Sequence, residues 1–235
     1  MIVGSISENI KIEKRVAITP DIVKKYKSLG LNVYLNKGYA LHLGISDKIY
    51  EDEGANIFEN QDEIISKSNA LLQMSILSDD NMNKLKEEQL LIGVLNVYSN
   101  EKKLKEITKK KVNCFSLELL PRITRAQSMD ILSSQANLAG YKAVVDSFAY
   151  FQKAIPMMMT AAGTISAAKV LIVGAGVAGL QAIATAKRMG AIVFATDVRA
   201  ASKEQVESLG GKFLTVKGAE NLETEGGYAK EASEE

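Results

Sequence analysis

The sequence predicts an α/β fold in which two parallel sheets are flanked by helices. Three observations predict this class. Short apolar runs alternate with charged amphipathic segments over residues 1–125, a stretch with helical spacing follows at 126–155, and a second set of strand and helix patterns occupies 156–235. We therefore expect an N-terminal α/β domain, a connecting helix and a second α/β domain with these boundaries.

In the first domain, apolar runs predict strands and capped amphipathic segments predict helices. Thr19, Pro20 and Asp21 supply a hydroxyl N-cap, a proline at the first helical position and an acid in the first turn, and Gly30 marks the end of that helix. The remaining elements of this domain are expected as strands at 2–5, 33–35, 70–75, 90–94 and 112–115, and as helices at 46–54, 81–87 and 101–110.

Residues 126–152 carry apolar side chains at helical spacing, as at Leu132, Ala136 and Ala143, and no proline precedes Pro156. A helix over most of this stretch would be ~30 Å long or more at a rise of 1.5 Å per residue. We expect it to connect the two sheets and to end at Pro156.

The second domain opens on a glycine-rich turn between an apolar strand and a helix. Gly174 allows the tight turn, Gly176 lets backbone N–H groups approach a pyrophosphate, and Gly179 lets the helix pack close to the strand. The helix N-terminus offers N–H groups and partial positive charge to the phosphates. This is the fingerprint of a Rossmann-type dinucleotide site, expected to involve the turn residues Gly174, Ala175, Gly176, Val177 and Gly179.

An acidic residue follows the second strand of this domain, expected at 191–196. Asp197 lies 18 residues after Gly179, where a carboxylate accepts hydrogen bonds from a ribose 2′-OH and repels a 2′-phosphate. NAD(H) is therefore favoured over NADP(H). Arg199 could soften this preference, but we interpret it as an exposed cation in the next loop.

Only a helix at 202–209 and a strand at 212–216 continue the pattern, before a polar segment at 218–235. A complete Rossmann fold has a second βαβαβ half. We therefore expect this to be the first half of a truncated Rossmann domain, and the chain to be a piece of a longer polypeptide.

Composition excludes several other classes of function. The net charge of +1 gives no field that would attract nucleic acid, and the basic run at 109–111 is interpreted as a solvated helix end. The single cysteine, Cys114, fits a reducing compartment. No signal peptide, membrane span or metal site is expected.

Three motifs resemble one family. The segment from Arg15 to Pro20 resembles the opening of the alanine dehydrogenase and transhydrogenase superfamily, and the segment from Arg122 to Tyr141 is similar to a signature of the NAD(H)-binding component, domain I of the alpha subunit, of proton-translocating NAD(P) transhydrogenases. The glycine turn with Asp197, Val198 and Arg199 resembles that family's nucleotide site, and the segment around Tyr228 resembles its mobile loop.

The resemblance implies an activity and its partners. Hydride would pass from NADH on this chain to NADP⁺ on a partner domain, coupled to proton translocation through a membrane domain. A homodimer is expected, peripheral at the cytoplasmic face of the inner membrane, or at the matrix side in a mitochondrion. By resemblance Arg122, Gln127 and Asp130 line the nicotinamide, Ser133 contacts the carboxamide, and Tyr228 lies on the loop that closes over the nucleotide.

Hydride passage between two nicotinamides needs oriented rings and no general base. His42 lies in a predicted loop far from either signature. By resemblance, Gln73 stands where alanine dehydrogenases have a substrate-binding lysine, and Asn96 and Val97 where they have a catalytic histidine. These departures count against a metabolite dehydrogenase. An alanine dehydrogenase-like enzyme and a nucleotide-binding module without turnover remain the alternatives.

From spacing alone, the signature serves equally well as a helix-capping arrangement. Thr124 or Ser128 would then be the N-cap, and Asp130 would interact with the helix dipole.

Overall fold

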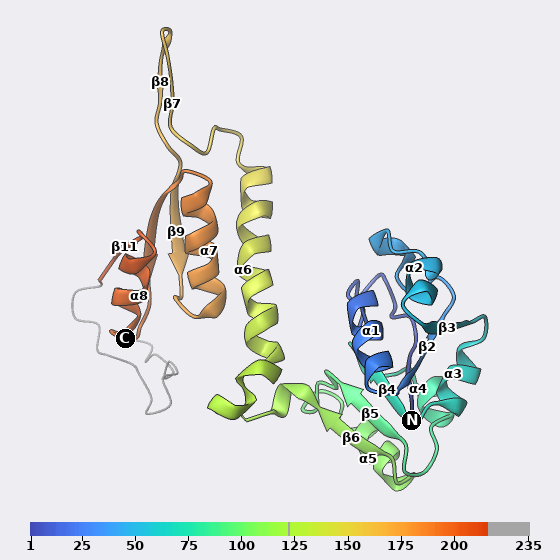
Figure 1. Ribbon diagram of the computed structural model, residues 1–235. Helices are drawn as coiled ribbons and strands as arrows, with labels where there is room; N and C mark the ends of the chain where they lie inside the picture. Colours follow the sequence, from blue (N-terminus) through green and yellow to red (C-terminus); the bar gives the residue numbers. More distant parts are fainter. Residues whose placement is uncertain (122, 216–235) are drawn as a thin grey trace. The chain divides into compact units, whose positions relative to one another are not determined.

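The computed structural model describes residues 1–121 and 123–215, and the chain divides into two units, Met1–Asp130 and Ile131–Glu235. Each unit is an α/β structure built on a parallel sheet flanked by helices (Figure 1), so the predicted fold class is confirmed. The three-part division at 125 and 155 stays a prediction. No helix in the described part of the chain is both long enough and apolar enough to cross a bilayer.

The first unit contains a six-stranded parallel sheet in the order β3-β2-β1-β4-β5-β6. This is the strand order of the doubly wound fold, in which the chain reverses direction between β1 and β4. The strands are β1 Ile2–Ser5, β2 Asn32–Asn36, β3 Ala55–Phe58, β4 Ala70–Gln73, β5 Leu90–Gly93 and β6 Asn113–Ser116.

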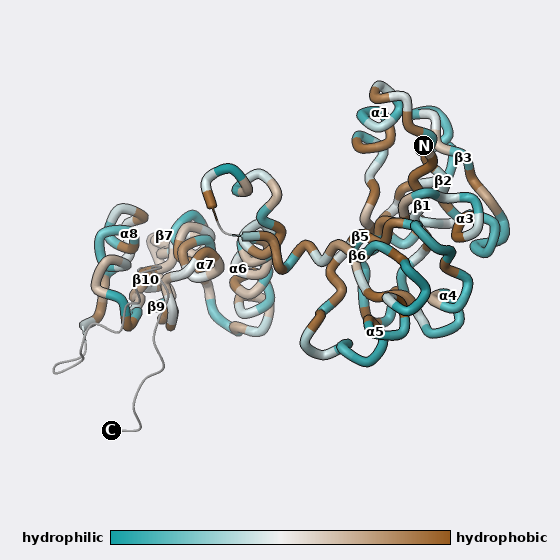
Figure 2. Tube along the Cα trace, turned by 90° about the horizontal axis from the view of Figure 1, so that it is seen from below, coloured by the Kyte–Doolittle hydropathy of each residue, from teal (hydrophilic) through white to brown (hydrophobic). Residues whose placement is uncertain are grey.

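Helices cover both faces of this sheet, each over its own core. Helices α1 and α2 contribute Val23 and Tyr50 to one cluster, and helices α3, α4 and α5 contribute side chains such as Ile64 and Ile107 to the other. Figure 2 shows hydrophobic residues along the strands and hydrophilic ones on the outer faces of α4 and α5. The helices are α1 Pro20–Ser28, α2 Asp47–Asp52, α3 Gln61–Lys67, α4 Asp79–Asn83 and α5 Glu101–Lys109, with 3₁₀ helices η1 Leu41–Leu43, η2 Leu117–Leu119 and η3 Thr124–Met129.

Three elements of this unit differ from the sequence-based expectation. Strand β3 and helix α3 were not predicted, because four and seven residues are too few to display a clear period. The helix expected at 81–87 is α4 at Asp79–Asn83, because the Ser78 side chain accepts a hydrogen bond from the Asn81 N–H (3.4 Å) and caps the helix earlier.

The second unit packs helix α6 beside helix α7, next to a three-stranded parallel sheet in the order β11-β10-β9. A Cβ on Gly140 would lie 2.0 Å from the Ala178 carbonyl oxygen, so a glycine permits this close helix contact. The elements are α6 Ile131–Tyr150, β7 Met158–Thr160, β8 Gly163–Ile165, β9 Lys169–Val173, α7 Val177–Arg188, β10 Ile192–Thr196, α8 Ser202–Ser208 and β11 Lys212–Phe213.

The connecting helix is shorter than expected. It begins at Ile131 because η3 occupies the preceding residues, and it ends at Tyr150, so the expectation that Pro156 ends it was wrong. The antiparallel hairpin β7–β8 was not predicted, since its turn at Ala161 and Ala162 lacks the usual Asn-Gly or Asp-Gly signal.

Candidate functional site

The glycine turn of the second unit joins β9 to α7, and its glycines meet different needs. Gly174 adopts a φ of 92°, which disfavours any side chain. A Cβ on Gly179 would lie 1.8 Å from the Gly174 carbonyl oxygen, so the helix packs against the turn through a missing side chain. Gly176 is different, because its φ of −75° is ordinary and a Cβ there would meet no atom within 4 Å.

Gly176 is also the N-cap of α7, and no side chain caps the helix among the described residues. Helix N-termini present N–H groups without intrahelical partners, together with partial positive charge. Gly176 and Val177 are exposed, whereas Ala175 is fully buried beneath the turn. The turn therefore presents a helix N-terminus and accessible backbone to solvent, as an anionic phosphate requires.

The carboxylate of Asp197 lies directly beside this turn, as the sequence predicts. One of its oxygens accepts a hydrogen bond from the Ala175 N–H at 2.6 Å, which ties the end of β10 to the turn. The Asp197 side chain is only 6% exposed. The Arg199 guanidinium, followed by backbone N–H donors, lowers the pKa of Asp197 to about 2, so the group is an anion at physiological pH.

Arg199 was interpreted as an exposed cation, and that interpretation was wrong. Its side chain is 21% exposed, and its Nε and Nη2 atoms donate to the two oxygens of Asp197 at 2.9 and 3.0 Å. The pairing is possible because Val198, whose side chain is exposed, turns the chain so that residues 197 and 199 face one another. A separation of two residues in the sequence gives no direct sign of such a pair.

The remaining predicted site residues lie near the junction of the two units. Gln127 is an exposed residue of η3, Asp130 directly precedes α6, and Ser133 is in the first turn of α6. Within the second unit, that turn lies at the same end as the glycine turn (Figure 1). Arg122 and Tyr228 lie outside the described residues.

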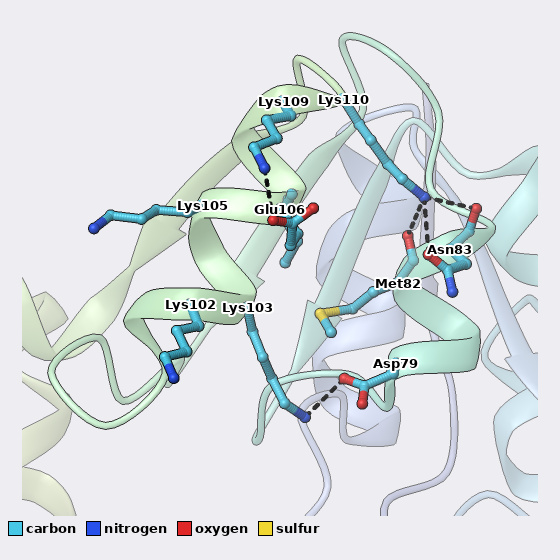
Figure 3. A pocket seen from close by; sticks show the side chains of 10 residues that line it. Asp79, Met82, Asn83, Lys102, Lys103, Lys105, Glu106, Lys109 and Lys110 are labelled. Carbon is cyan, nitrogen blue, oxygen red and sulfur yellow. Dashed lines mark hydrogen bonds and ion pairs between the residues drawn. The ribbon is translucent and has the colours of Figure 1, made fainter.

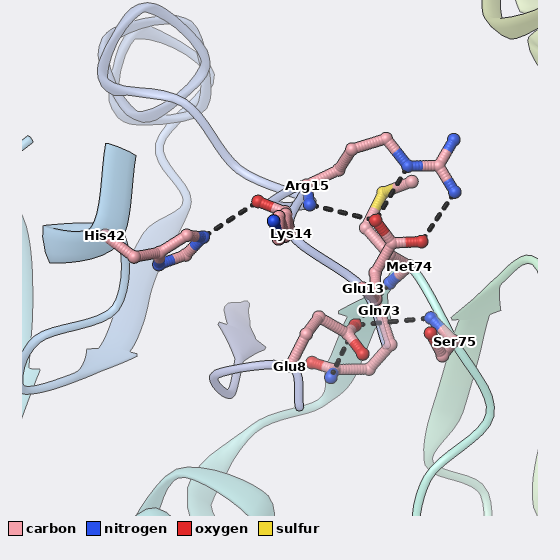
Figure 4. Close-up of polar contacts among 8 residues, drawn as sticks. All are labelled: Glu8, Glu13, Lys14, Arg15, His42, Gln73, Met74 and Ser75. Atoms are coloured by element: carbon pink, nitrogen blue, oxygen red, sulfur yellow. Dashed lines mark hydrogen bonds and ion pairs between the residues drawn. The ribbon is translucent and has the colours of Figure 1, made fainter. Parts of the chain in front are cut away.

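The first unit has its own polar cluster, at the carboxyl ends of β1 and β4 (Figure 4). The Gln73 side chain is 4% exposed. Its amide oxygen accepts from the Ile6 N–H (2.8 Å) and lies 3.1 Å from the Ser5 hydroxyl, and its amide nitrogen donates to the Ile6 carbonyl (3.2 Å) and to Glu8 (3.3 Å). Both ends of the amide are thus used to join the two strands.

Glu8 closes the same cluster. Its carboxylate accepts hydrogen bonds from the N–H groups of Met74 (2.7 Å) and Ser75 (3.2 Å), yet burial is the largest influence and raises its pKa. Beside it is a cavity of about 430 Å³ lined by residues from the loops after both strands, among them Glu8, Glu13, Ser75 and Asn81. Sequence reasoning missed Glu8, although an acid just after the first strand of a doubly wound sheet is a recognisable signal.

Neither His42 nor Arg15 is placed for catalysis in this unit. His42 lies in the 3₁₀ helix η1, and its Nε2 contacts the Lys14 carbonyl at 2.8 Å (Figure 4). Arg15 forms an ion pair with Glu13, with 2.6 Å between Nη2 and Oε2. No group of three or more potential metal ligands is found within the described ranges.

The position that resembles the histidine site of alanine dehydrogenases is also closed by this chain's own side chains. Asn96 has a φ of 52°, and the neighbouring Val97 N–H donates to Glu118 at 3.3 Å. Burial acts to raise the pKa of Glu118, but the hydrogen bonds to its carboxylate together outweigh burial and lower the pKa. This part of the first unit therefore holds an anion of its own.

A second cavity, of about 530 Å³, lies between α4 and α5 and is lined by five lysines (Figure 3). Three of these have carboxylate partners: Lys103 pairs with Asp79, Lys105 with Glu101 and Lys109 with Glu106. The Lys110 ammonium donates to the Asn83 carbonyl at the end of α4 (2.9 Å). This cavity is thus lined mainly by cations that already have local partners.

Comparisons with known proteins agree with this architecture. Residues 4–139 match the family described as alanine dehydrogenase/PNT, N-terminal domain, and residues 143–233 match the corresponding C-terminal domain. The chain is 49% identical over 230 residues to the first of the separate alpha-subunit chains of the NAD(P) transhydrogenase of Rhodospirillum rubrum, covering 95% of this chain and 60% of the relative. It is 46% identical over 237 residues to the corresponding protein of Rickettsia prowazekii, covering 99% and 62%.

A solved structure is similar as well. The transhydrogenase from Sinorhizobium meliloti superposes with a TM-score of 0.87 at 46% identity, over 92% of this chain and 64% of that one. The chain thus spans about 60% of the length of the relatives it matches. On the two family matches, which together span most of its length, the chain belongs to the alanine dehydrogenase/PNT family.

Proposed function

We propose that this chain carries the NAD(H) site of a proton-translocating NAD(P) transhydrogenase. When bound, the reduced nicotinamide supplies a hydride for NADP⁺ held on a partner domain, and the complex couples this step to proton translocation. The similarity to transhydrogenase alpha subunits at 46–49% identity supports this reaction.

The observation that carries the proposal is Gly176. The fold makes no demand for glycine at this position, because the backbone is ordinary and the space beyond it is open. A bulky anion that approaches the backbone at the start of α7 does make that demand. Asp197, an anion 2.6 Å from the Ala175 N–H of the same turn, adds an acceptor for ribose hydroxyls and favours NAD(H) over NADP(H).

The residues assigned to the nicotinamide act by position. Arg122 supplies a fork of donors, Gln127 both donates and accepts, and Asp130 and Ser133 are three residues apart at the start of α6. None of them has to remove a proton, because hydride passage between two nicotinamides involves none. Tyr228 is assigned to the segment that covers the bound nucleotide.

The first unit offers an amino-acid substrate little to bind. Gln73 uses both ends of its amide within the chain, and Glu118 occupies the Val97 N–H. An alanine dehydrogenase-like activity would need a cation for the substrate carboxylate and a base for the amine. This favours hydride transfer to another nucleotide over oxidation of a metabolite.

A homodimer belongs to this proposal, together with the NADP(H) domain and the membrane domain. The hairpin β7–β8 exposes Met158, Met159 and Ile165 by 50% or more, and exposed apolar side chains that gather on one element mark association surfaces. The chain would then be peripheral, at the cytoplasmic face of the inner membrane or at the matrix side of a mitochondrion.

The test is reduction of NADP⁺ by NADH in the assembled complex, with wild type and Gln127→Asn. We expect Gln127→Asn to lower hydride transfer far more than NADH affinity, since the residue orients rather than binds. Equal losses would make Gln127 a binding contact only. Turnover of alanine with NAD⁺ would favour the dehydrogenase alternative, and NADH binding without transfer would favour the module without turnover.

A further inference from the structure

The Asp197 carboxylate is fully used by donors of its own chain. Its Oδ1 accepts from the backbone N–H of Arg199 (2.8 Å) and from Arg199 Nε (2.9 Å), and its Oδ2 accepts from the Ala175 N–H (2.6 Å) and from Arg199 Nη2 (3.0 Å). An ionised carboxylate has about four lone-pair positions. All four therefore have a protein donor before any ribose hydroxyl arrives.

These four donors differ in whether they can leave. The Ala175 and Arg199 N–H groups belong to the backbone of the turn and of the segment after β10, so their positions are set by the fold. The guanidinium is at the end of a long side chain that is 21% exposed, and it can rotate away without moving the backbone. A ribose hydroxyl that donates to Asp197 must therefore replace the guanidinium.

We propose that Arg199 is a specificity-determining residue of the nucleotide site, whose guanidinium occupies the acceptor positions of Asp197 and is displaced when NADH binds. The inference rests on the proposed NAD(H) site and deepens it. The displaced cation remains beside the ribose, so it attracts a 2′-phosphate. Arg199 thereby opposes NADH through competition and assists NADPH through charge, which is the reverse of the preference that Asp197 imposes.

The experiment compares wild type with Arg199→Met, which keeps the apolar stem but removes the donors, in fluorescence titrations of the full chain with NADH and with NADPH. We expect Arg199→Met to bind NADH about threefold to tenfold more tightly, the effect of no longer giving up a charge-assisted hydrogen bond. NADPH affinity should stay constant or fall, because the cation near the 2′-position is lost. Arg199→Lys, a cation without the bidentate fork, should lie between the two for NADH.

Lys203→Ala is the matched control, since it removes a nearby exposed cation that has no contact with Asp197 in the described structure. It should leave NADH affinity unchanged. An Arg199→Met variant that binds NADH equally or more weakly overturns the inference while the NAD(H) site stands, and so does an equal gain for both nucleotides. A wild-type chain that does not bind NADH overturns the proposed function and this inference with it.

Discussion

The two units use the same strand–turn–helix arrangement on a parallel sheet, but they fill its carboxyl edge differently. In the first unit, the loop after β1 is held by the side chains of Gln73 and Glu8, which use backbone donors of both strands. In the second unit, the turn after β9 is glycine-rich, and its helix N-terminus has no side-chain cap in the described part of the chain. Strand order places a site at this edge, whereas turn chemistry decides whether the edge is available to a ligand.

The physical reason is the cost of an unsatisfied polar group. A buried N–H or carbonyl without a partner costs about 1–3 kcal/mol, so a sheet edge closes on its own side chains unless a ligand takes their place. Gln73 is such a closure, and Asp197 with Arg199 is a partial one. The first is buried in the fold, while the second involves a side chain that can leave.

The largest expected effect separates two glycines of the same turn. Gly179→Ala places a Cβ 1.8 Å from the Gly174 carbonyl oxygen, and we expect the free energy of unfolding of the second unit to fall by about 3 kcal/mol or more. Gly176→Ala meets open space, so its free energy of unfolding should stay within about 0.5 kcal/mol of wild type. Its NADH affinity should nevertheless fall at least about tenfold, because the methyl group occupies the path of the pyrophosphate.

Urea unfolding followed by circular dichroism measures the stability of both glycine variants, and NADH titration measures binding by Gly176→Ala. Normal NADH affinity in Gly176→Ala would remove the main support for a phosphate at this turn. It would also make the two sheet edges alike.

The second prediction tests whether the edge of the first unit is structural. Gln73→Leu leaves the Ile6 N–H and carbonyl groups without their buried partner, and we expect it to lower the free energy of unfolding of this unit by about 2–4 kcal/mol. NADH affinity of the folded variant should not change. Gln61→Leu, at an exposed position of α3, is the control and should stay within about 0.5 kcal/mol.

The third prediction concerns pH. The pKa of Asp197 falls from 3.8 to about 2 on folding, so the ionised form stabilises the second unit, by at most about 2 kcal/mol. This contribution is complete above pH 4 and is lost as the pH falls from about 4 to 2. In Asp197→Asn the urea midpoint of this unit should therefore change less between pH 5 and pH 2.5 than in wild type, and discrimination against NADPH should relax. An identical pH dependence in both proteins would argue against the Asp197–Arg199 pair in solution.

The smallest expected effect has the opposite sign and lies in the first unit. Burial raises the pKa of Glu8, so its ionisation costs stability as the pH rises through that raised pKa, and the unit gains as the group becomes protonated. Glu8→Gln keeps an oxygen that can accept from the Met74 N–H. We expect a change of less than about 1 kcal/mol at neutral pH, together with a weaker dependence of the urea midpoint on pH between 4 and 7. A large loss of stability would mean that the charge itself holds the loop.

Local patterns predicted much of this structure. The strands at 2–5 and 90–94, the helix at 101–110 and the glycine turn each follow from spacing and capping within a few residues. Strand β3, helix α3 and hairpin β7–β8 were missed because they are short and are stabilised by neighbours distant in the sequence or by an unusual turn. For the same reason, the predicted boundary of α6 was five residues too early.

The candidate site divides in the same way. The glycines and Asp197 could be predicted because their spacing along the chain reflects a geometric requirement of the nucleotide. Arg199 was misinterpreted because its pairing depends on how the segment after β10 turns, and Gln73 was noted only as a departure from a family pattern. The roles of Gln127, Asp130 and Ser133 stay predictions.

By itself, the sequence determined the class of fold, the turn at 174–179 and the acid that follows the second strand, since each depends on contacts between residues close along the chain. Only the tertiary structure decided which edges are closed. It brought Gln73 within 3.2 Å of the Ile6 carbonyl across 67 residues, and it aimed the Arg199 guanidinium at Asp197. Such contacts form because buried polar groups must find partners, and the chain path, rather than any local pattern, decides which partners are within reach.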